Sequence, residues 1–165
     1  MLSLTRNQRG MTLAEVIIAT AIIGIGLVAL SSAIPLAGYG IHEGGHLSTA
    51  TFLANERLEQ VRNARWEVGP PTLDNLGVSA SATVAPVSGG VTTFPDENPV
   101  AAPYTEYSST VRVASCGAGA GCNGIVSPDM RQVTVTATYR PMTGVGVAPV
   151  GTTKPATVTM YIAKR

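Results

Sequence analysis

Residues 9–36 read RGMTLAEVIIATAIIGIGLVALSSAIPL and form the most distinctive segment of the chain. No charged residue occurs between Val16 and His42 when histidine is counted as neutral. As a helix, Met11–Leu30 would be about 30 Å long, which matches the hydrocarbon core of a bilayer. The sequence therefore predicts a membrane-spanning helix near the N-terminus.

The flank before this run is basic, with Arg6 and Arg9 and no acid. By the positive-inside rule, we expect residues 1–10 in the cytoplasm and the chain after about residue 36 on the far side of the membrane. The pattern is typical of a single-pass protein with a short cytoplasmic part and a long exported part.

Composition limits what the rest of the chain can be. A length of 165 residues suits one domain, because domains usually have about 100–200 residues. This length argues against a multidomain enzyme or a polytopic transporter. Charged residues make up 13% of the chain, against about 25% in a typical soluble domain. The net charge is +1 and no large Lys/Arg cluster occurs, so no nucleic-acid partner is predicted.

Glu15 lies inside the apolar run and separates three interpretations of it. A secretory signal peptide would be cleaved near Ser31-Ser32-Ala33, and a plain anchor would keep the whole segment. Neither needs an acid, which costs about 2.5–3.5 kcal/mol at the centre of a membrane helix and less near its end. The carboxylate therefore indicates a further function for this segment.

The residues Arg9-Gly10-Met11-Thr12-Leu13-Ala14-Glu15, followed by an uncharged run, resemble the class III signal sequence of type IV pilins and type II secretion pseudopilins. In that family a membrane-embedded prepilin peptidase cuts after the glycine, here Gly10, on the cytoplasmic side. The same enzyme methylates the new N-terminal residue, here Met11, where the family more often has Phe. The glutamate at the fifth mature position, here Glu15, is the family's hallmark acid.

The resemblance implies that cleavage leaves the apolar helix attached, so that it anchors the precursor and later forms a filament core. There Glu15 would neutralise the N-terminal amine of a neighbouring subunit, because a buried carboxylate is tolerated when it is paired. The implied partners are the prepilin peptidase, other pilins or pseudopilins, the inner-membrane assembly platform and, before assembly, membrane lipid. The implied location is the bacterial inner membrane and then a periplasmic or cell-surface filament.

After the apolar run come several helix breakers: Pro35, Gly38, Gly40, Gly44 and Gly45. We therefore expect residues 35–46 to be kinked or partly melted. Spacings of three and four between apolar residues then predict an amphipathic helix, with a stripe of Leu47, Ala50, Ala54, Leu58, Val61 and Ala64. The segment ANERLEQVR at 54–62 is similar to the second helix half of minor pilins and pseudopilins of the V or I type.

The chain after Trp66 has the composition of a β-rich domain. We expect Pro70-Pro71 to end the helix, and β-like runs occur at Val78–Val87 and Gly90–Phe94. Alternation of apolar and polar residues predicts an antiparallel sheet of three or four strands, which include Tyr107–Ser115, Arg131–Tyr139 and Ala156–Ala163. One face of this sheet would cover the apolar stripe of the helix.

These segments predict an α+β fold, and the resemblance implies the type IV pilin-like lollipop, a long N-terminal helix packed on a small antiparallel β-sheet. We expect a cytoplasmic leader at 1–10, a transmembrane helix half at 11–36, a hinge and amphipathic helix half at 37–65, and a β-rich periplasmic or extracellular domain at 66–165. The implied function is a structural subunit, a minor pilin or pseudopilin, and not an enzyme. No cofactor is predicted.

Cys116 and Cys122 flank a glycine-rich loop between two predicted strands. In a chain exported to an oxidising compartment, an even pair of cysteines favours a disulfide over two free thiols. Two ligands are too few for a zinc site, and no Lys-Ser/Thr follows the glycines as it does in a phosphate-binding loop. We therefore expect a disulfide between these two residues.

His42-Glu43-Gly44-Gly45-His46 matches H-E-x-x-H, in which two histidines bind zinc and the glutamate acts as base. The alternative function is therefore a membrane-anchored zinc metallopeptidase, with a carboxylate such as Glu67 as third ligand because the chain has no other histidine. The two glycines disfavour the rigid helix that the motif needs, so a polar hinge is the favoured interpretation. The cluster Asp96-Glu97-Asn98 likewise offers calcium ligands, although a solvated turn is favoured there.

Overall fold

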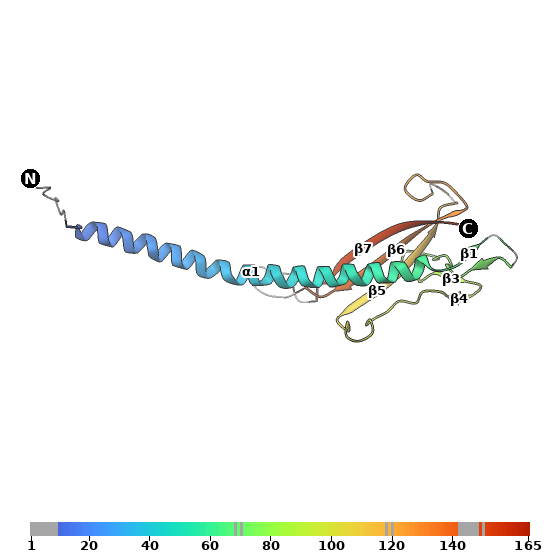
Figure 1. The fold of residues 1–165 in the computed structure, drawn as a ribbon, viewed down its shortest axis with the longest axis horizontal. Helices are drawn as coiled ribbons and strands as arrows, with labels where there is room; N and C mark the ends of the chain where they lie inside the picture. Colours follow the sequence, from blue (N-terminus) through green and yellow to red (C-terminus); the bar gives the residue numbers. More distant parts are fainter. Residues whose placement is uncertain are drawn as a thin grey trace, which may run out of the picture. The chain divides into compact units, whose positions relative to one another are not determined.

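The structure is a computed structural model that describes residues 10–67, 69, 71–117, 119, 121–141, 149 and 151–165. The expected leader, residues 1–10, lies outside the described residues except for Gly10. The chain divides into two compact units, Met1–Ile41 and His42–Arg165. Within the described residues it forms one helix followed by seven strands (Figure 1).

Helix α1 spans Leu13–Arg62 and so ends well before Pro71, while Pro70 lies outside the described residues. It runs without interruption through Pro35 and the glycines that follow, so the expected melting of residues 35–46 is wrong. Proline removes one backbone hydrogen bond, and each glycine costs about 1 kcal/mol relative to alanine. A helix that continues on both sides nevertheless propagates through such residues, because the costly nucleation step is already complete.

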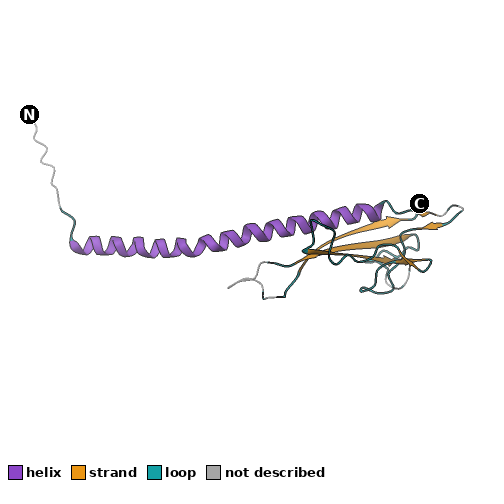
Figure 2. Ribbon diagram, turned by 90° about the horizontal axis from the view of Figure 1, so that it is seen from below, coloured by secondary structure: helices purple, strands orange, loops and turns teal. Residues whose placement is uncertain are grey.

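From His42 onward, one face of α1 packs against the strands (Figure 2). Its buried residues are Ala50, Leu53, Ala54 and Val61, so the predicted stripe is confirmed at three positions. Leu58 and Ala64 are partly buried against the same core, whereas Leu47 is 46% exposed. The packed face also includes Glu43 and His46, which a search for apolar residues alone could not assign to it.

Three antiparallel strands form the main sheet, in the order β5 (Tyr107–Ser115), β6 (Met130–Tyr139) and β7 (Lys154–Ala163). The predicted strands agree with these bounds to within two residues at each end. The register pairs Val135 with Val111 on one side and with Val158 on the other. The alternation is confirmed, because the fully buried residues of this sheet are Val111, Val113, Val133, Val135 and Ala137.

Two short hairpins precede this sheet, β1 (Trp66–Glu67) with β2 (Leu73–Asp74) and β3 (Val87–Ser88) with β4 (Val91–Thr92). The predicted β-like runs at 78–87 and 90–94 are therefore mostly irregular. Val78 forms only an isolated β-bridge with Val87. Part of the reason is local, since Pro86 has no amide hydrogen to donate and Gly89 and Gly90, with φ of 57° and 82°, form the turn of the second hairpin.

The loops of the same segment pair with the outer edge of β5. Ser79 donates its amide hydrogen to the Val113 carbonyl at 2.8 Å, and Glu97 and Ser109 exchange two backbone hydrogen bonds of 2.9 Å. These bonds satisfy groups that an open sheet edge would leave unpaired.

An ion pair joins the first hairpin to β6. Arg131 donates hydrogen bonds of 2.6 and 2.8 Å to the two carboxylate oxygens of Asp74, and its guanidinium lies 4.2 Å from the ring centre of Trp66. The hydrogen bond from Arg131 holds the pKa of Asp74 below its usual range, with a further contribution from the Gly77 amide. The hairpin is thus tied to the sheet by charge as well as by apolar packing.

Candidate functional site

Gly10 and Met11, the expected cleavage and methylation positions, lie directly before α1. Both are exposed, Met11 to 68%, and among the described residues, chain neighbours aside, no atom lies within 4 Å of the position that a Cβ on Gly10 would occupy. The bond between them lies outside regular secondary structure. Exposed segments of this kind are the ones that proteases cut most readily.

Thr12 caps the N-terminus of α1, a role that the sequence interpretation did not assign to it. Its hydroxyl accepts a hydrogen bond from the Glu15 amide at 3.3 Å, and its carbonyl accepts from the amides of Glu15 and Val16 at 3.1 and 3.2 Å. Thr-x-x-Glu is the sequence of a capping box, so the signal was present in residues 12–15. The helix therefore begins at a residue that cleavage after Gly10 would leave in place.

Glu15 lies in the first turn of α1 and is exposed. An acid in this position is favoured by the partial positive charge of the helix N-terminus. Within the described residues its carboxylate has no side-chain partner. The structure therefore places the predicted assembly residue in the first turn of the helix, exposed and without a side-chain partner among the residues that the structure describes.

The apolar residues that follow Glu15 are exposed rather than packed. The large exposed residues of this run are Val16, Ile17, Ile18, Ile22, Ile23, Ile25, Leu27, Val28, Leu30, Ile34 and Leu36. The helix is long and apolar enough to cross a membrane, and its most apolar window has no part buried in the protein. A soluble domain does not normally leave an apolar surface of this size uncovered.

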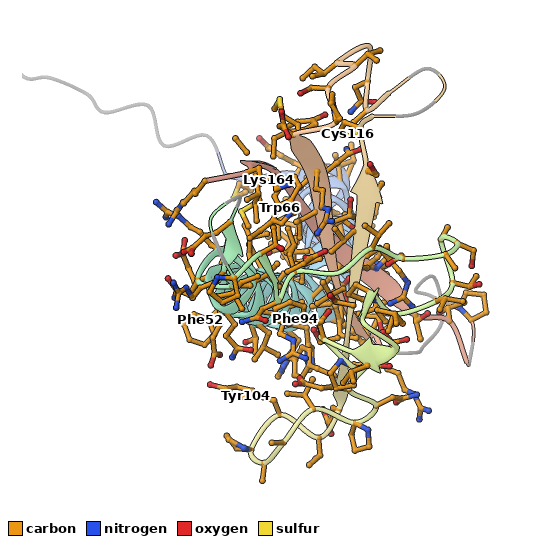
Figure 3. All side chains as sticks on the ribbon, turned by 90° about the vertical axis from the view of Figure 1, so that its right-hand side faces the viewer. Phe52, Trp66, Phe94, Tyr104, Cys116 and Lys164 are labelled. Carbon is orange, nitrogen blue, oxygen red and sulfur yellow. A yellow bond between two sulfur atoms is a disulfide. The ribbon has the colours of Figure 1, made fainter. Side chains whose placement is uncertain are left out.

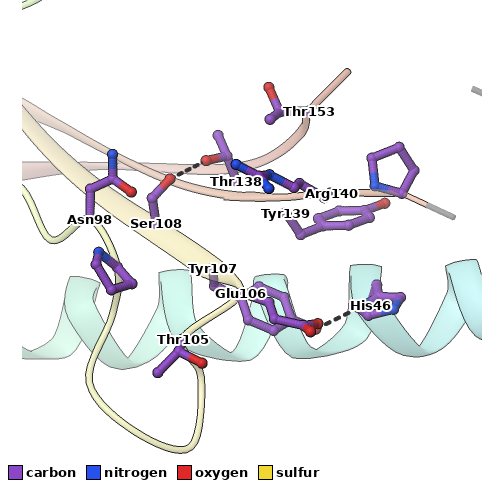
Figure 4. Close-up of a pocket in the computed structure, with 12 residues that line it drawn as sticks. His46, Asn98, Thr105, Glu106, Tyr107, Ser108, Thr138, Tyr139, Arg140 and Thr153 are labelled. Carbon is purple, nitrogen blue, oxygen red and sulfur yellow. Dashed lines mark hydrogen bonds between the residues drawn. The ribbon is translucent and has the colours of Figure 1, made fainter. Parts of the chain in front are cut away.

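The three residues of the predicted zinc motif are engaged in different ways. His42 is exposed, whereas Glu43 accepts hydrogen bonds from the Tyr139 hydroxyl at 2.8 Å and from Lys154 Nζ at 2.6 Å. His46 Nδ1 lies 2.9 Å from the Tyr107 hydroxyl (Figure 4). The ring of His46 also stacks on that of Tyr139, with centres 5.9 Å apart. Glu43 and His46 thus hold α1 against the ends of the strands.

The charges of this network follow from its contacts. The hydrogen bonds from Lys154 and then Tyr139 lower the pKa of Glu43. Burial, with the nearby Glu43 carboxylate, raises the pKa of Tyr139 to about 12. A hollow of about 720 Å³ opens beside His46 and is lined mainly by hydroxyl and amide side chains (Figure 4). Glu43 is therefore an ionised partner of Lys154 rather than a free base.

The expected third zinc ligand is engaged elsewhere. Glu67 forms a two-pronged ion pair with Arg65, with distances of 2.9 and 3.1 Å, and Arg65 lowers its pKa. In the part of the chain that the structure describes, no three His, Cys, Asp or Glu residues are grouped to hold a metal ion. The arrangement therefore gives no support to the zinc metallopeptidase alternative.

The acidic cluster at 96–98 is also engaged in ion pairs. Arg112 donates hydrogen bonds of 2.6 and 2.8 Å to the two carboxylate oxygens of Asp96, and Arg57 Nη1 lies 3.0 Å from Glu97 Oε1. Arginine neutralises both carboxylates and occupies oxygens that a calcium ion would need. The cluster fastens its loop to β5 and to α1.

Cys116 and Cys122 form the expected disulfide, with an S–S distance of 2.03 Å and Cα atoms 4.9 Å apart. Both residues are buried, and Figure 3 shows Cys116 at one end of the sheet. Gly121 has φ of +69°, and a Cβ there would lie 2.1 Å from the Ile125 carbonyl oxygen. Glycine is therefore required at this position of the closed loop.

Comparison with known proteins identifies the N-terminal segment. Residues 5–31 match the family model described as the prokaryotic N-terminal methylation motif. Searches of the curated proteins and of the solved structures gave no match.

The chain therefore carries a prepilin-type N-terminal methylation motif, and the predicted resemblance to the type IV pilin and pseudopilin family is confirmed at that level. The motif, an α+β fold with a long apolar helix, and the disulfide support a type IV pilin-like or pseudopilin subunit anchored in a membrane.

Proposed function

We propose that this chain is a structural subunit, a minor pilin or pseudopilin, of a type IV pilus or a type II secretion filament. The observation that carries the proposal is the methylation motif at residues 5–31, which includes the start of α1, an uninterrupted helix whose first half has exposed apolar side chains. Such a surface has to be covered, first by lipid and then by other helices.

The first step of the proposed pathway is processing by a prepilin peptidase. The enzyme cuts between Gly10 and Met11 on the cytoplasmic side and methylates the Met11 amine. The exposure of both residues supports this step, as does their position before the Thr12 cap. Cleavage there removes Arg6 and Arg9 and leaves the helix intact, so the same segment anchors the precursor and enters the filament.

The second step is assembly through the apolar half of α1. Glu15 pairs with the Met11 amine of a neighbouring subunit, because an uncompensated carboxylate among apolar helices is costly whereas an ion pair there is tolerated. Only one axial offset between helices brings the two groups together, so the pair selects the offset at which a new subunit joins. The exposed Glu15 carboxylate, with no side-chain partner among the described residues, supports this role.

The location follows from the same scheme. Residues 1–10 lie in the cytoplasm, the apolar half of α1 crosses the inner membrane, and the unit His42–Arg165 lies in the periplasm or at the cell surface. The Cys116–Cys122 disulfide fits an oxidising compartment. The helix sequence at 54–62 supports a minor subunit of the V or I type, assembled with other pilins or pseudopilins on an inner-membrane platform.

Mass spectrometry of the N-terminus tests the proposal. The protein is expressed in a cell that contains a prepilin peptidase and is purified from membranes. We expect a mature chain that begins with N-methylated Met11. A Gly10→Leu variant is the matched control and should keep residues 1–10. A wild-type chain that retained these residues, or that began near Ile34, would contradict the proposal.

A further inference from the structure

The two outer edges of the main sheet differ in what lies against them. Strand β6 is in the middle, so β5 and β7 each have one outer edge (Figure 1). The Lys164 amide donates to the Asp129 carbonyl at 2.9 Å, in register with the β6–β7 pairs. Along an antiparallel strand, residues that bond to the neighbouring strand alternate with residues that do not. The even-numbered residues of β7 therefore bond to β6, and the odd-numbered residues direct their backbone groups outward.

The outer edge of β5 is covered by this chain. By the same alternation its odd-numbered residues point outward, because the Cys116 amide donates to the Met130 carbonyl in register with the β5–β6 pairs. The loops before β5 bond to this edge at three such residues, Tyr107, Ser109 and Val113. These contacts agree with the alternation, and they leave little of this edge for another strand.

The outer edge of β7 is open over most of its length. Just beyond its end the Arg165 amide, which also points outward, donates to the Trp66 carbonyl at 3.0 Å. Near its start Pro155 points outward but has no N–H group. The outward residues between them, which we call the β7 edge, are Thr157, Thr159, Tyr161 and Ala163. Within the described residues, their backbone N–H and C=O groups have no hydrogen-bond partner.

The sequence of the β7 edge lacks the devices by which proteins prevent strand addition. Natural edges carry charges, prolines or bulges that discourage pairing with another chain. Residues 157–163 read TVTMYIA, with no charge, proline or glycine, and their pairing with β6 is continuous, without a bulge. Uncharged segments of this length and β-propensity pair readily with a further strand. The difference between the two edges therefore indicates a binding site for a strand.

We infer that the β7 edge binds an extended segment of another protein by β-strand addition, a contact separate from the proposed assembly through the apolar half of α1. The backbone groups of the edge supply the affinity, and the side chains on the two faces select the partner. On the inner face Val158, Met160 and Ile162 are only partly buried, so the segment has apolar residues at every second position. On the outer face Thr157 and Thr159 are exposed, and the alternate positions of the segment are small and polar.

The charges around β7 set the direction of the bound segment. The strand contains no acid, and Lys154 at its start is paired with Glu43. Lys164 and Arg165 follow its end and form no ion pair with an acidic side chain in the part of the chain that the structure describes. Antiparallel addition, the arrangement already present in this sheet, brings the N-terminal end of the segment to these cations. The segment therefore carries an acidic residue at that end.

A synthetic peptide tests the inference. The probe is a fluorescent, C-terminally amidated peptide EQVTVTAT, which is residues 131–138 with glutamate in place of Arg131, because β6 already pairs with β7 antiparallel. We expect saturable binding to the full-length protein in detergent, measured by fluorescence anisotropy. Thr159→Pro should weaken binding at least tenfold, since it removes an outward N–H group that β6 does not use. Thr159→Val keeps this group, so this matched control should bind within twofold of wild type.

A second measurement keeps the test independent of how well Thr159→Pro folds. The same peptide with N-methyl groups on alternate residues, on the edge that faces β7, should bind the wild-type protein at least tenfold more weakly. Three results would overturn the inference: no saturable binding of the probe, equal binding of the probe and its N-methylated form, or a wild-type dimer that Thr159→Pro converts to a monomer. In the last case a second copy of this chain, and not another protein, would occupy the edge. None of these results depends on whether the chain enters a filament.

Discussion

The two halves of α1 form the same secondary structure for opposite reasons. In the unit Met1–Ile41, large apolar side chains are exposed, and the most apolar window of the helix has no part buried in the protein. In the unit His42–Arg165, the helix has fully buried residues such as Ala54 and Val61, and polar contacts from Glu43 and His46. The first half is suited to lipid and other helices, and the second to its own sheet. Substitutions in one half should therefore leave the properties of the other unchanged.

The largest effect is expected from Glu15→Ala in the apolar half. Membrane insertion and cleavage after Gly10 should stay intact, because neither step needs this carboxylate. Incorporation into filaments should fall at least tenfold, since the neighbouring amine loses its partner. Quantitative blotting of sheared filaments against the membrane pool measures the ratio. Normal incorporation of Glu15→Ala would show that assembly through the apolar half of α1 does not depend on this carboxylate.

The next largest effect is expected from Leu53→Ala in the packed half. Leu53 is buried against the core of the second unit, so its truncation should lower the free energy of unfolding by about 2–4 kcal/mol. Ile25→Ala, in the exposed half, is the matched control and should change it by less than about 0.5 kcal/mol. Urea unfolding in detergent, followed by Trp66 fluorescence, measures both. If Leu53→Ala and Ile25→Ala lowered the free energy of unfolding equally, the two halves of α1 would not differ in their packing against the sheet.

A smaller effect is expected at the disulfide, which stabilises only the second unit. Replacing both Cys116 and Cys122 with serine should cost about 2 kcal/mol, because the closed loop is short and removes little entropy from the unfolded chain. Thermal unfolding with and without a reducing agent measures the change in wild type. The double variant should be insensitive to the reducing agent. If the wild-type protein were equally insensitive to the reducing agent, the disulfide would contribute nothing to the stability of this unit.

The smallest effect is expected at the ion pair of Asp74 with Arg131. The pair lowers the pKa of Asp74, so its contribution is present above the unfolded-state pKa and is lost as the pH falls through the lower, folded-state pKa. Stability should therefore decrease as the pH falls below about 4. Asp74→Asn should cost about 1–2 kcal/mol at pH 7, because the carboxylate is partly exposed and the pair is screened.

The pH series itself is the measurement for this last prediction. Denaturant midpoints of wild type and Asp74→Asn should converge as the pH falls from 7 to 3. Midpoints that stay equally far apart over this range would show that the Asp74 charge is not the origin of the difference. Glu43 also has a lowered pKa, so part of the acid sensitivity should remain in the variant.

Much of the fold was predictable because its signals are periodic and local. The uncharged run predicted the exposed half of α1, and alternation predicted β5, β6 and β7 with the correct buried face. The N-terminal site was also predictable, since its motif is a fixed order of residues, although the Thr12 cap within it was missed. These features depend on near neighbours in the chain.

Other predictions failed because distant residues decide them. Helix breakers suggested a melted segment at 35–46, but the helix is continuous there, and Glu43 and His46 reach Tyr139 and Tyr107 from its far end. The β-like run at 78–87 is largely irregular because its backbone pairs at single points with β3 and β5 instead of forming a strand of its own. Sequence spacing contains no information on these partners.

The sequence alone was enough to locate the methylation motif, the segment long and apolar enough to cross a membrane, and the three long strands, because charge, hydropathy and side-chain alternation are properties of the local chain. The tertiary structure was needed to show that Glu43 and His46 lie on the face of α1 that the sheet covers, a face whose apolar residues the spacing had predicted in part. It also showed that these two residues, unlike the exposed His42, serve packing, and that the acids at 74, 96 and 97 are paired with arginines. Those outcomes depend on residues tens of positions apart that meet only when the sheet closes on the helix.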